Sequence, residues 1–398
     1  MLAMKNLLIM HGGGPTAVIN ASLYGAVREA KRHTEVGHIY GAIGGSGGLM
    51  KEQLRDLREI PERELYFLLS TPGSAIGTSR DRLRENEYRK MTEVLRKYEI
   101  DCVLLNGGNG TMDTCGKLWR QCKADGMDIR VMGIPKTMDN DIAVTDHAPG
   151  YGSAARYIAA SVQEVCADVR SLPIHVVIIE ASGRNAGWIT AASALARAVP
   201  GADGGKGFGP DLIYLPERPF SEEAFLQDVS RLIEKKKGVV VVVSEGLKNE
   251  KGEPVAEPVF VSGRDVYFGD VCGHLAGLVQ KKLGYKARAE KPGLLGRASI
   301  AYQSSVDREE AILAGELACR AVLAGESGKM VAFKREEGEE YRVTPFLVPI
   351  EQVMLEEKRL PDAFINAEGN GVTDAFIRWA APLIGEPLPQ MVSFRNDG

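Results

Sequence analysis

The chain has 398 residues, of which 44% are hydrophobic and 26% charged, a composition typical of an ordinary globular protein with room for two or three domains. Its 49 basic and 53 acidic residues leave a formal charge of −4, which excludes a global attraction to nucleic acid or anionic membranes. No stretch approaches the roughly 18 apolar residues of a membrane span, and the first apolar run is too short for a signal peptide. We therefore expect a cytoplasmic protein whose local Arg and Lys residues attract any anionic substrate.

The first motif is a glycine loop near the amino terminus. Asn6–Met10 is expected to form a strand and Ala17–Lys31 a helix, with Gly12, Gly13 and Gly14 between them. A glycine loop between a strand and a helix is a candidate phosphate cradle. Its spacing matches neither a P-loop nor G-x-G-x-x-G, so neither motif is assigned.

A polar loop with the sequence STPGSAIGTSRDRLRENEYRK follows. Arg80 lies among its Gly and Ser residues, where a guanidinium can clamp a phosphate. Arg82, Arg84 and Arg89 are expected on the solvated face of the next helix, and the same interpretation is open for Arg80.

A second glycine loop follows the apolar run Cys102–Asn106. Gly107, Gly108 and Gly110 let the backbone approach an anion, and Thr111 is expected to cap the following helix. The positive end of that helix would then face a phosphate. The alternative is a turn with glycines for steric reasons alone.

A cluster of polar residues follows the next expected strand, Val131–Ile134. Lys136, Thr137, Asp139 and Asp141 lie at its carboxyl end, where α/β sheets hold ligands. One carboxylate can take a proton from an attacking hydroxyl while the other coordinates Mg²⁺. The alternative is a solvated turn.

The second half repeats the pattern of strand, glycine turn and helix. His175–Glu180 is expected to be a strand that ends in Ser182, Gly183 and Arg184. The further strands Leu212–Leu215 and Val239–Val243 end near the acidic residues Glu217 and Glu245. Such an acid can accept hydrogen bonds from sugar hydroxyls or simply cap its strand, and both interpretations stay open here.

The most basic stretch, KARAEKPGLLGR with the lysines just before it, contains Arg288 and Arg297. It lacks the interleaved aromatic residues of a nucleic-acid surface and fits a phosphosugar site better. The six cysteines form no C-x-x-C pair, so we expect reduced core thiols. The repeated pattern predicts an α/β fold with mostly parallel sheets.

In this order, the motifs resemble those of the phosphofructokinase family over most of the chain. GGGPTAVINAS resembles the opening loop, GGNGT the donor loop, PKTMDND the catalytic segment, ASGRNAGW the Met-Gly-Arg segment and VVVSEG the sugar-binding turn. The Lys-Thr-x-Asp-Asn-Asp form and the tail VTDAFIRWAAPLIG resemble the largely pyrophosphate-dependent branch. The resemblance implies two Rossmann-like lobes. We expect a donor lobe at 1–151 plus about 296–346 and a fructose 6-phosphate lobe at 152–295 plus about 347–398.

The resemblance also implies a role for each motif residue. Asp139 would be the base for the sugar 1-hydroxyl, with Lys136, Thr137 and Arg184 as further catalytic residues. Mg²⁺ would bind at Asn109 and Asp141. The donor would bind at Gly13, Arg80, Gly108, Asn109, Gly110 and Thr111. Fructose 6-phosphate would bind at Thr137, Asp139, Ser182, Gly183, Arg184, Glu245, Arg288 and Arg297.

The sequence departs from the family pattern at positions that bear on the donor and on the sugar pocket. Asn109 replaces an Asp near the metal, and Ser182 replaces a methionine. Pyrophosphate users carry Asp at position 110, where its carboxylate obstructs an ATP α-phosphate. Gly110 therefore favours ATP, whereas Lys136 is the residue that pyrophosphate users keep.

We accordingly expect an ATP-dependent 6-phosphofructokinase of glycolysis that makes fructose 1,6-bisphosphate. The alternative is a pyrophosphate-dependent enzyme, and a second alternative is a catalytically weakened sugar-phosphate or nucleotide-binding protein. Sedoheptulose 7-phosphate is an equally open acceptor. The resemblance implies a homodimer or homotetramer.

Overall fold

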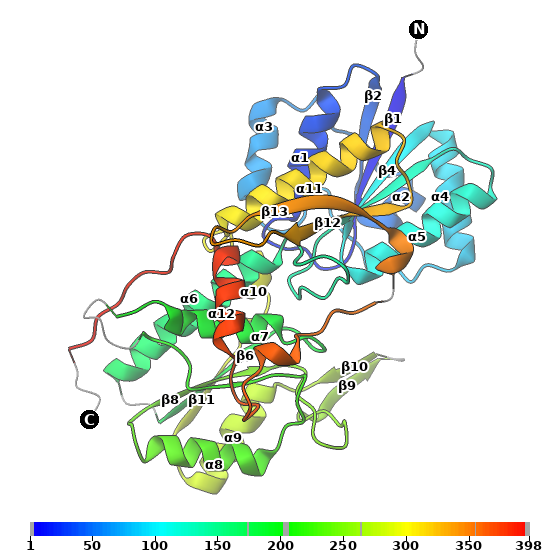
Figure 1. The fold of residues 1–398 in the computed structure, drawn as a ribbon. Coiled ribbons are helices and arrows are strands. Elements are labelled where there is room, and N and C mark those ends of the chain that lie inside the picture. The colour runs from blue at the N-terminus through cyan, green and yellow to red at the C-terminus, as the bar shows by residue number, and fades with distance from the viewer. Residues whose placement is uncertain (1–3, 173–174, 202–206, 263–264, 355, 395–398) are drawn as a thin grey trace. The chain divides into compact units, whose positions relative to one another are not determined.

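The computed structural model describes residues 4–172, 175–201, 207–262, 265–354 and 356–394 (Figure 1). The chain divides into two compact units. Unit 1 comprises Met1–Ser153 and Arg297–Lys358, and unit 2 comprises Ala154–Gly296 and Arg359–Gly398. The last boundary lies at Lys358, and the expectation of about 346 was wrong. The reason is that β13 (Val343–Pro349) pairs with β12 (Lys329–Arg335) and extends the sheet of unit 1.

Unit 1 contains a seven-stranded sheet in the order β13-β12-β5-β4-β1-β2-β3. Its remaining strands are β1 (Lys5–His11), β2 (Val36–Ala42), β3 (Leu54–Asp56), β4 (Ile100–Gly107) and β5 (Arg130–Pro135). Strands β2, β1, β4, β5 and β12 run parallel, and the edge strands β3 and β13 are antiparallel to their neighbours. The prediction of mostly parallel sheets is confirmed.

Helices cover both faces of this sheet, because successive side chains of each strand point to opposite faces. Leu7 and Ile9 belong to the core beneath one pair of helices, whereas Leu8 and Met10 belong to the core beneath another pair. The first pair is α1 (Ile19–Lys31) and α11 (Ser305–Leu323), and the second is α4 (Glu85–Lys97) and α5 (Asn109–Ala124). Shorter helices of unit 1 are α2 (Gly45–Met50), α3 (Glu62–Tyr66) and the 3₁₀ turns Phe67–Ser70 and Ile350–Gln352.

Unit 2 contains a four-stranded parallel sheet in the order β11-β6-β8-β7. Its strands are β6 (Val176–Ala181), β7 (Leu212–Tyr214), β8 (Val239–Ser244) and β11 (Ala287–Glu290), and a separate hairpin is formed by β9 (Pro258–Ser262) and β10 (Asp265–Phe268). The five valines of β8 are buried on both faces of the sheet, as expected for a central parallel strand.

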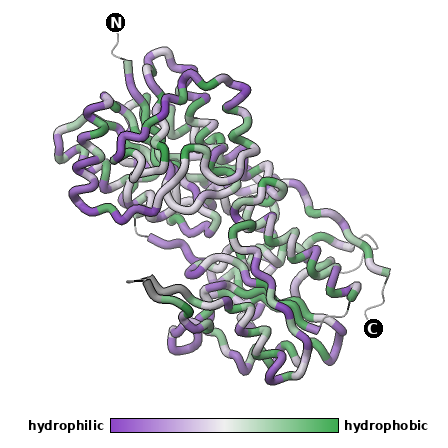
Figure 2. The backbone as a smooth tube through the Cα atoms, turned by 180° about the vertical axis from the view of Figure 1, so that it is seen from behind, coloured by the Kyte–Doolittle hydropathy of each residue, from purple (hydrophilic) through white to green (hydrophobic). Residues whose placement is uncertain are grey.

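Helices of unit 2 pack around this sheet, and Figure 2 shows hydrophilic and hydrophobic residues in alternation along the chain of this unit. The α-helices are α7 (Trp188–Ala192), α8 (Glu222–Ile233), α9 (Val271–Leu283) and α12 (Asp374–Ala380), with 3₁₀ turns at Ser193–Ala198, Asp362–Phe364 and Ala381–Ile384. Two further helices, α6 (Tyr151–Ser171) and α10 (Leu295–Ala298), contain two of the three points where the chain passes between the units.

Two general expectations can be compared with the fold. All six cysteines are buried and unpaired, which confirms the prediction of core thiols. In the part of the chain that the structure describes, every helix is too short or too polar to cross a membrane.

Helices α1 and α11 approach each other closely because glycines face the contact. A Cβ built on Gly25 would lie 2.1 Å from the Ile312 carbonyl oxygen, and one on Gly315 would lie 2.0 Å from that of Ser22. Since real Cβ atoms do not come within 3 Å of backbone, any larger residue would push the helices apart.

We predict that Gly315→Ala lowers the free energy of unfolding by about 1–3 kcal/mol, because overpacking outweighs the better helix propensity of alanine. The matched control is Gly277→Ala in α9, where a Cβ meets no atom within 4 Å. That change should leave the protein as stable or slightly more stable. Urea titration measures both variants, and equal effects would contradict the close contact.

Candidate active site

Three loops of unit 1 start at the same edge of its sheet because the strands before them end in register. His11 of β1 lies beside Asn106 of β4, and Gly107 of β4 lies beside Pro135 of β5. The first glycine loop, the second glycine loop and the segment beginning at Lys136 therefore emerge side by side. The carboxyl edge of a parallel sheet is where α/β proteins bind ligands.

The two glycine loops touch through Thr111. A Cβ on Gly12 would lie 2.3 Å from the Thr111 hydroxyl oxygen, and one on Gly107 would lie 2.1 Å from it. Helix α5 begins at Asn109, with Gly108 as the extended residue before it. The prediction that Thr111 caps this helix was therefore wrong, because the side chain is enclosed between the two loops.

Three cations surround the first glycine loop. The Lys136 ammonium donates a hydrogen bond to the Gly14 carbonyl oxygen. A Cβ on Gly14 would lie 2.6 Å from Arg297 Nη1 and 3.1 Å from Arg80 Nη2. These groups line a cavity of about 420 Å³ together with Gly13, Gly108, Asn109, Gly110, Thr111, Thr137, Asp139 and Asp141. The predicted donor residues thus lie in one cavity.

Lys136 is buried beside other cations. Desolvation lowers its pKa to about 8, the Asp139 carboxylate acts in the opposite direction, and Arg297 lowers the pKa further. A buried ammonium near two guanidinium groups is unfavourable unless an anion is present. The site is therefore suited to a polyanion such as a chain of phosphoryl groups.

His11 lies at the floor of this cavity and is neutral. Desolvation and the nearby Lys136 lower its pKa to about 3. The Ser74 hydroxyl donates its proton to the Gly77 carbonyl oxygen at 2.8 Å and must accept from His11 Nδ1 at 2.7 Å. His11 Nε2 is then free to accept from the Asn106 amide at 3.4 Å. The imidazole links the ends of β1 and β4 to the loop that contains Ser74 without adding charge.

The carboxylate of Asp141 is fixed by its neighbours. It accepts hydrogen bonds from the Thr137 hydroxyl at 2.9 Å and from Asn109 Nδ2 at 2.8 Å. The Thr137 hydroxyl oxygen in turn accepts from the Asp139 amide at 3.1 Å. Asp139 and Asp141 are both partly buried and line the same cavity.

Asn109 and Asp141 could hold a divalent cation. Asn109 Oδ1 is buried without a hydrogen-bond partner, and the amide nitrogen of the same side chain contacts Asp141. Among the described residues no three His, Cys, Asp or Glu side chains form a metal cluster. Magnesium does not require one, because it is usually held by one or two protein oxygens, waters and substrate phosphates.

The residues predicted to bind the sugar divide between the units. In unit 2, Gly183 N donates to Glu245 Oε1 at 3.1 Å, and the Ser244 hydroxyl donates to the Gly183 carbonyl oxygen at 2.6 Å. Arg184 and Glu245 line a cavity of about 520 Å³ in this unit, next to the partly buried Ser182.

Two predicted sugar ligands lie elsewhere. Arg288 is exposed on the edge strand β11, beside Val177 of β6. Arg297 belongs to unit 1 and lies against Gly14 in the donor cavity. Glu217 accepts hydrogen bonds from the backbone amides of Gly187 and Leu360 at 2.8 and 3.1 Å. It therefore has a structural role at the end of its strand, which was the alternative to binding a sugar hydroxyl.

The residues of the donor cavity that sequence reasoning missed include His11, Ser46 and Asp81. The Ser46 hydroxyl donates to Asp81 Oδ2 at 2.7 Å. Although desolvation acts in the opposite direction, hydrogen bonds from Ser46 and Ser79 lower the pKa of Asp81 and keep it anionic. The position of Asp81 directly after Arg80 was the available signal.

Comparison with known proteins supports one family for the whole chain. Residues 6–324 match the family described as Phosphofructokinase. The chain is 36% identical to the pyrophosphate–fructose 6-phosphate 1-phosphotransferase of Xanthomonas campestris pv. campestris (strain B100), over 98% of this chain and 96% of that protein.

Solved structures give the same picture. The pyrophosphate-dependent phosphofructokinase from Marinobacter aquaeolei superposes with a TM-score of 0.86 at 33% identity, covering 98% of this chain and 95% of that one. The corresponding enzyme from Nitrosospira multiformis gives a TM-score of 0.87 at 32% identity, covering 99% and 95%. The α/β fold predicted from the sequence is confirmed.

The prediction of ATP as the donor was wrong, because these similar proteins are named as pyrophosphate-dependent. The prediction rested on Gly110, which lacks the side chain that would obstruct an ATP α-phosphate. A Cβ at Gly110 would indeed meet no atom within 4 Å. Open space admits a nucleotide but supplies no contacts that bind one, so it does not establish ATP use.

We predict that pyrophosphate binding weakens as the pH rises through about 8, because Lys136 then loses its proton. In Lys136→Arg the guanidinium stays charged, and this inflection should disappear. Calorimetric titration between pH 6.5 and 9.5 measures both proteins. Protonation of pyrophosphate itself affects both equally, so parallel pH profiles would contradict the assignment to Lys136.

Proposed function

Because the chain belongs to the phosphofructokinase family, we propose that it transfers a phosphoryl group from pyrophosphate to the 1-hydroxyl of fructose 6-phosphate. The products are fructose 1,6-bisphosphate and orthophosphate. The observation that carries this proposal is the convergence of Lys136, Arg80 and Arg297 on one glycine loop, in the cavity that also contains Asp139 and Asp141. Phosphoryl transfer needs such positioning and charge stabilisation.

Asp139 is the proposed general base. Its carboxylate accepts the proton of the sugar 1-hydroxyl while the oxygen attacks the nearer phosphorus atom of pyrophosphate. The bond from that phosphorus to the bridging oxygen breaks, and orthophosphate leaves with the bridging electrons. The Thr137 hydroxyl oxygen accepts from the Asp139 amide and so fixes the backbone that carries the base.

The cations act on the donor. Lys136 donates a hydrogen bond to the Gly14 carbonyl oxygen of the loop, and its proposed role is to stabilise charge on the transferring group. Arg80 and Arg297 have guanidinium groups that match phosphate oxygens in two-point contacts. Neutral His11 supports the loop and adds no competing charge.

Asn109 and Asp141 are the proposed Mg²⁺ ligands, since the unpartnered Asn109 oxygen and the Asp141 carboxylate fit a hard cation. When bound, Mg²⁺ would neutralise charge on the phosphoryl oxygens. The amide of Asn109 contributes no charge of its own, so Asp141 supplies the anionic oxygen.

The proposed sugar-phosphate ligands of unit 2 are Ser182, Gly183, Arg184, Glu245 and Arg288. Glu245 is already oriented by the Gly183 amide, and its remaining carboxylate oxygen can accept from a sugar hydroxyl. Arg184 is exposed and lines the same cavity, where it can pair with a phosphate. Ser182 adds a hydroxyl beside this set.

We predict turnover of fructose 6-phosphate with pyrophosphate and Mg²⁺ and none with ATP and Mg²⁺. A coupled assay that detects fructose 1,6-bisphosphate measures both donors. Sedoheptulose 7-phosphate in place of fructose 6-phosphate tests the acceptor. No turnover of either sugar with pyrophosphate would refute the proposed function.

We predict that Asp139→Asn lowers kcat by about 10²–10⁴-fold, the range expected for loss of a general base. Pyrophosphate binding should be retained, because Asn preserves the size of the side chain. The control is Asp128→Asn, which removes an exposed carboxylate of the same unit. An unchanged kcat in Asp139→Asn would assign the base to another residue.

A further inference from the structure

The catalytic segment between β5 and α6, residues 136–150, has a strained backbone. Among the described residues, four that are not glycine have positive φ, and two of them lie here: Asn140 at 50° and Val144 at 69°. A β-branched residue such as valine strongly disfavours this conformation. Such backbone persists only where the surrounding structure holds it in place.

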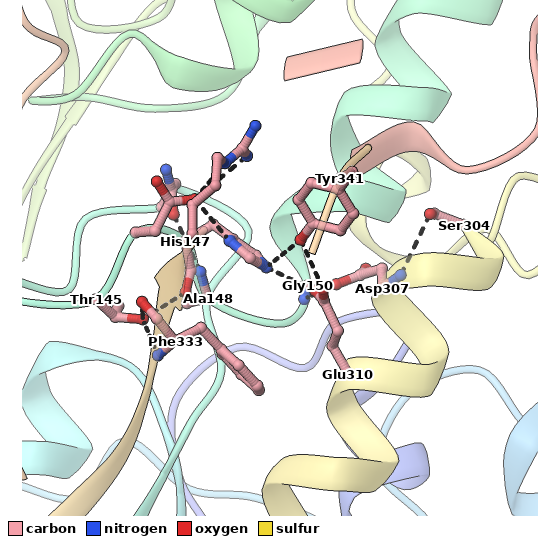
Figure 3. A network of polar contacts seen from close by, with 12 residues as sticks. Thr145, His147, Ala148, Gly150, Ser304, Asp307, Glu310, Phe333 and Tyr341 are labelled. Atoms are coloured by element: carbon pink, nitrogen blue, oxygen red, sulfur yellow. Dashed lines mark hydrogen bonds and ion pairs between the residues drawn. The ribbon is translucent and has the colours of Figure 1, made fainter. Parts of the chain in front are cut away.

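One end of the segment is held by a buried polar network, shown in Figure 3. His147 contacts Glu310 at 2.6 Å and Asp146 at 3.0 Å, and the Tyr341 hydroxyl donates to Glu310 at 2.6 Å. Desolvation lowers the pKa of His147, but the two carboxylates more than offset it and raise the pKa to about 9.

The same end is also tied to the sheet and to α11. Phe333 N of β12 donates to the Thr145 hydroxyl oxygen at 2.9 Å, and Asp146 N donates to the Phe333 carbonyl oxygen at 2.9 Å. Asp307 accepts from Gly150 N at 2.8 Å. Residues 145–150, which we term the loop base, are therefore fixed independently of the strained residues.

Lys358 joins this loop base to the residues that carry the chemistry. Its ammonium donates to the carbonyl oxygens of Thr145 at 2.9 Å and Asp146 at 2.8 Å, and to Asn140 Oδ1 at 3.3 Å. Its backbone amide donates to the Asp141 carbonyl oxygen at 2.8 Å. One residue thus spans the strained stretch from Asn140 to Asp146.

We propose that Lys358 is a positioning residue of the reaction: it holds Asn140 against the loop base and thereby fixes the carboxylates of Asp139 and Asp141 on either side. This role rests on the proposed function. Asn140 is fully buried, and its Oδ1 also accepts from Ala148 N at 3.1 Å, so both of these hydrogen bonds hold the turn between the two aspartates.

The geometry suits an ammonium group. The three acceptors match its three N–H groups, whereas a neutral amine has two. All three acceptors are oxygen atoms, which suit the N–H groups of a lysine side chain. A misplacement of about 1 Å at a catalytic group can cost about 10²-fold in rate.

The test compares Lys358→Met with Lys358→Arg. We expect Lys358→Met to lower kcat about 10–100-fold and to leave the KM for both substrates within about twofold. Lys358→Arg retains the charge and the hydrogen-bond donors in a different geometry. Its kcat should therefore lie between those of Lys358→Met and the wild type. Lys334→Met, at an exposed lysine of β12, controls for the loss of one positive charge.

A second measurement needs no turnover. Hydrogen–deuterium exchange of the ligand-free protein should be faster in Lys358→Met for residues 139–146 and unchanged for α11. This measurement separates the proposed function from the proposed role of Lys358. An inactive wild-type protein would refute the function, whereas the exchange rates still test whether Lys358 holds the segment. A global rise in exchange, or none, would overturn the positioning role.

A suppressor gives the sharpest readout. Val144 is 48% exposed, and glycine adopts its φ of 69° without strain. Val144→Gly should therefore recover part of the kcat lost in Lys358→Met. Unchanged kcat in folded Lys358→Met, or no recovery in the double variant, would refute the proposal.

Discussion

The register of β1, β4 and β5 is the constraint from which the donor site follows. These strands pair so that His11, Asn106 and Ile134 lie in one row, and the chain leaves all three strands within one residue of that row. A slip of one residue would turn every side chain of a strand to the other face. The two helix pairs that cover the sheet bury alternating residues of β1, so the cores on both faces prevent that slip.

Electrostatics explains why the cavity is suited to polyanions. Lys136, Arg80 and Arg297 meet at Gly14, while water is largely excluded from the lysine. The cost of burying that ammonium appears as its lowered pKa and is relieved when phosphoryl groups enter. His11, which lines the same cavity, is neutral because burial and the nearby Lys136 lower its pKa. Preformed charge of this kind needs no rearrangement when the reaction occurs.

The sequence predicted the features that short stretches encode. The glycine loops, Lys136, Asp139 and Asp141 stand out because each follows an apolar run within a few residues. The predictions that failed concerned contacts between residues far apart in sequence, or rested on the absence of a side chain. Arg297 lies beside Gly14 although the segment Ala154–Gly296 separates them in sequence. In addition, β13 pairs with the first sheet, and Thr111 packs between loops instead of capping α5. Gly110 misled for a different reason, because a missing side chain does not indicate what binds there.

The catalytic segment shows why local motifs cannot describe a site completely. PKTMDND contains the proposed reactive groups, and its Asn140 has a positive φ of 50°. The hydrogen bond from Lys358 to Asn140 spans 218 positions, and the ion pair between His147 and Glu310 spans 163. Two distant parts of the chain thus supply the order that places Asp139 and Asp141. In the proposed role, Lys358 therefore contributes to the rate by placing these carboxylates, even though it touches no substrate.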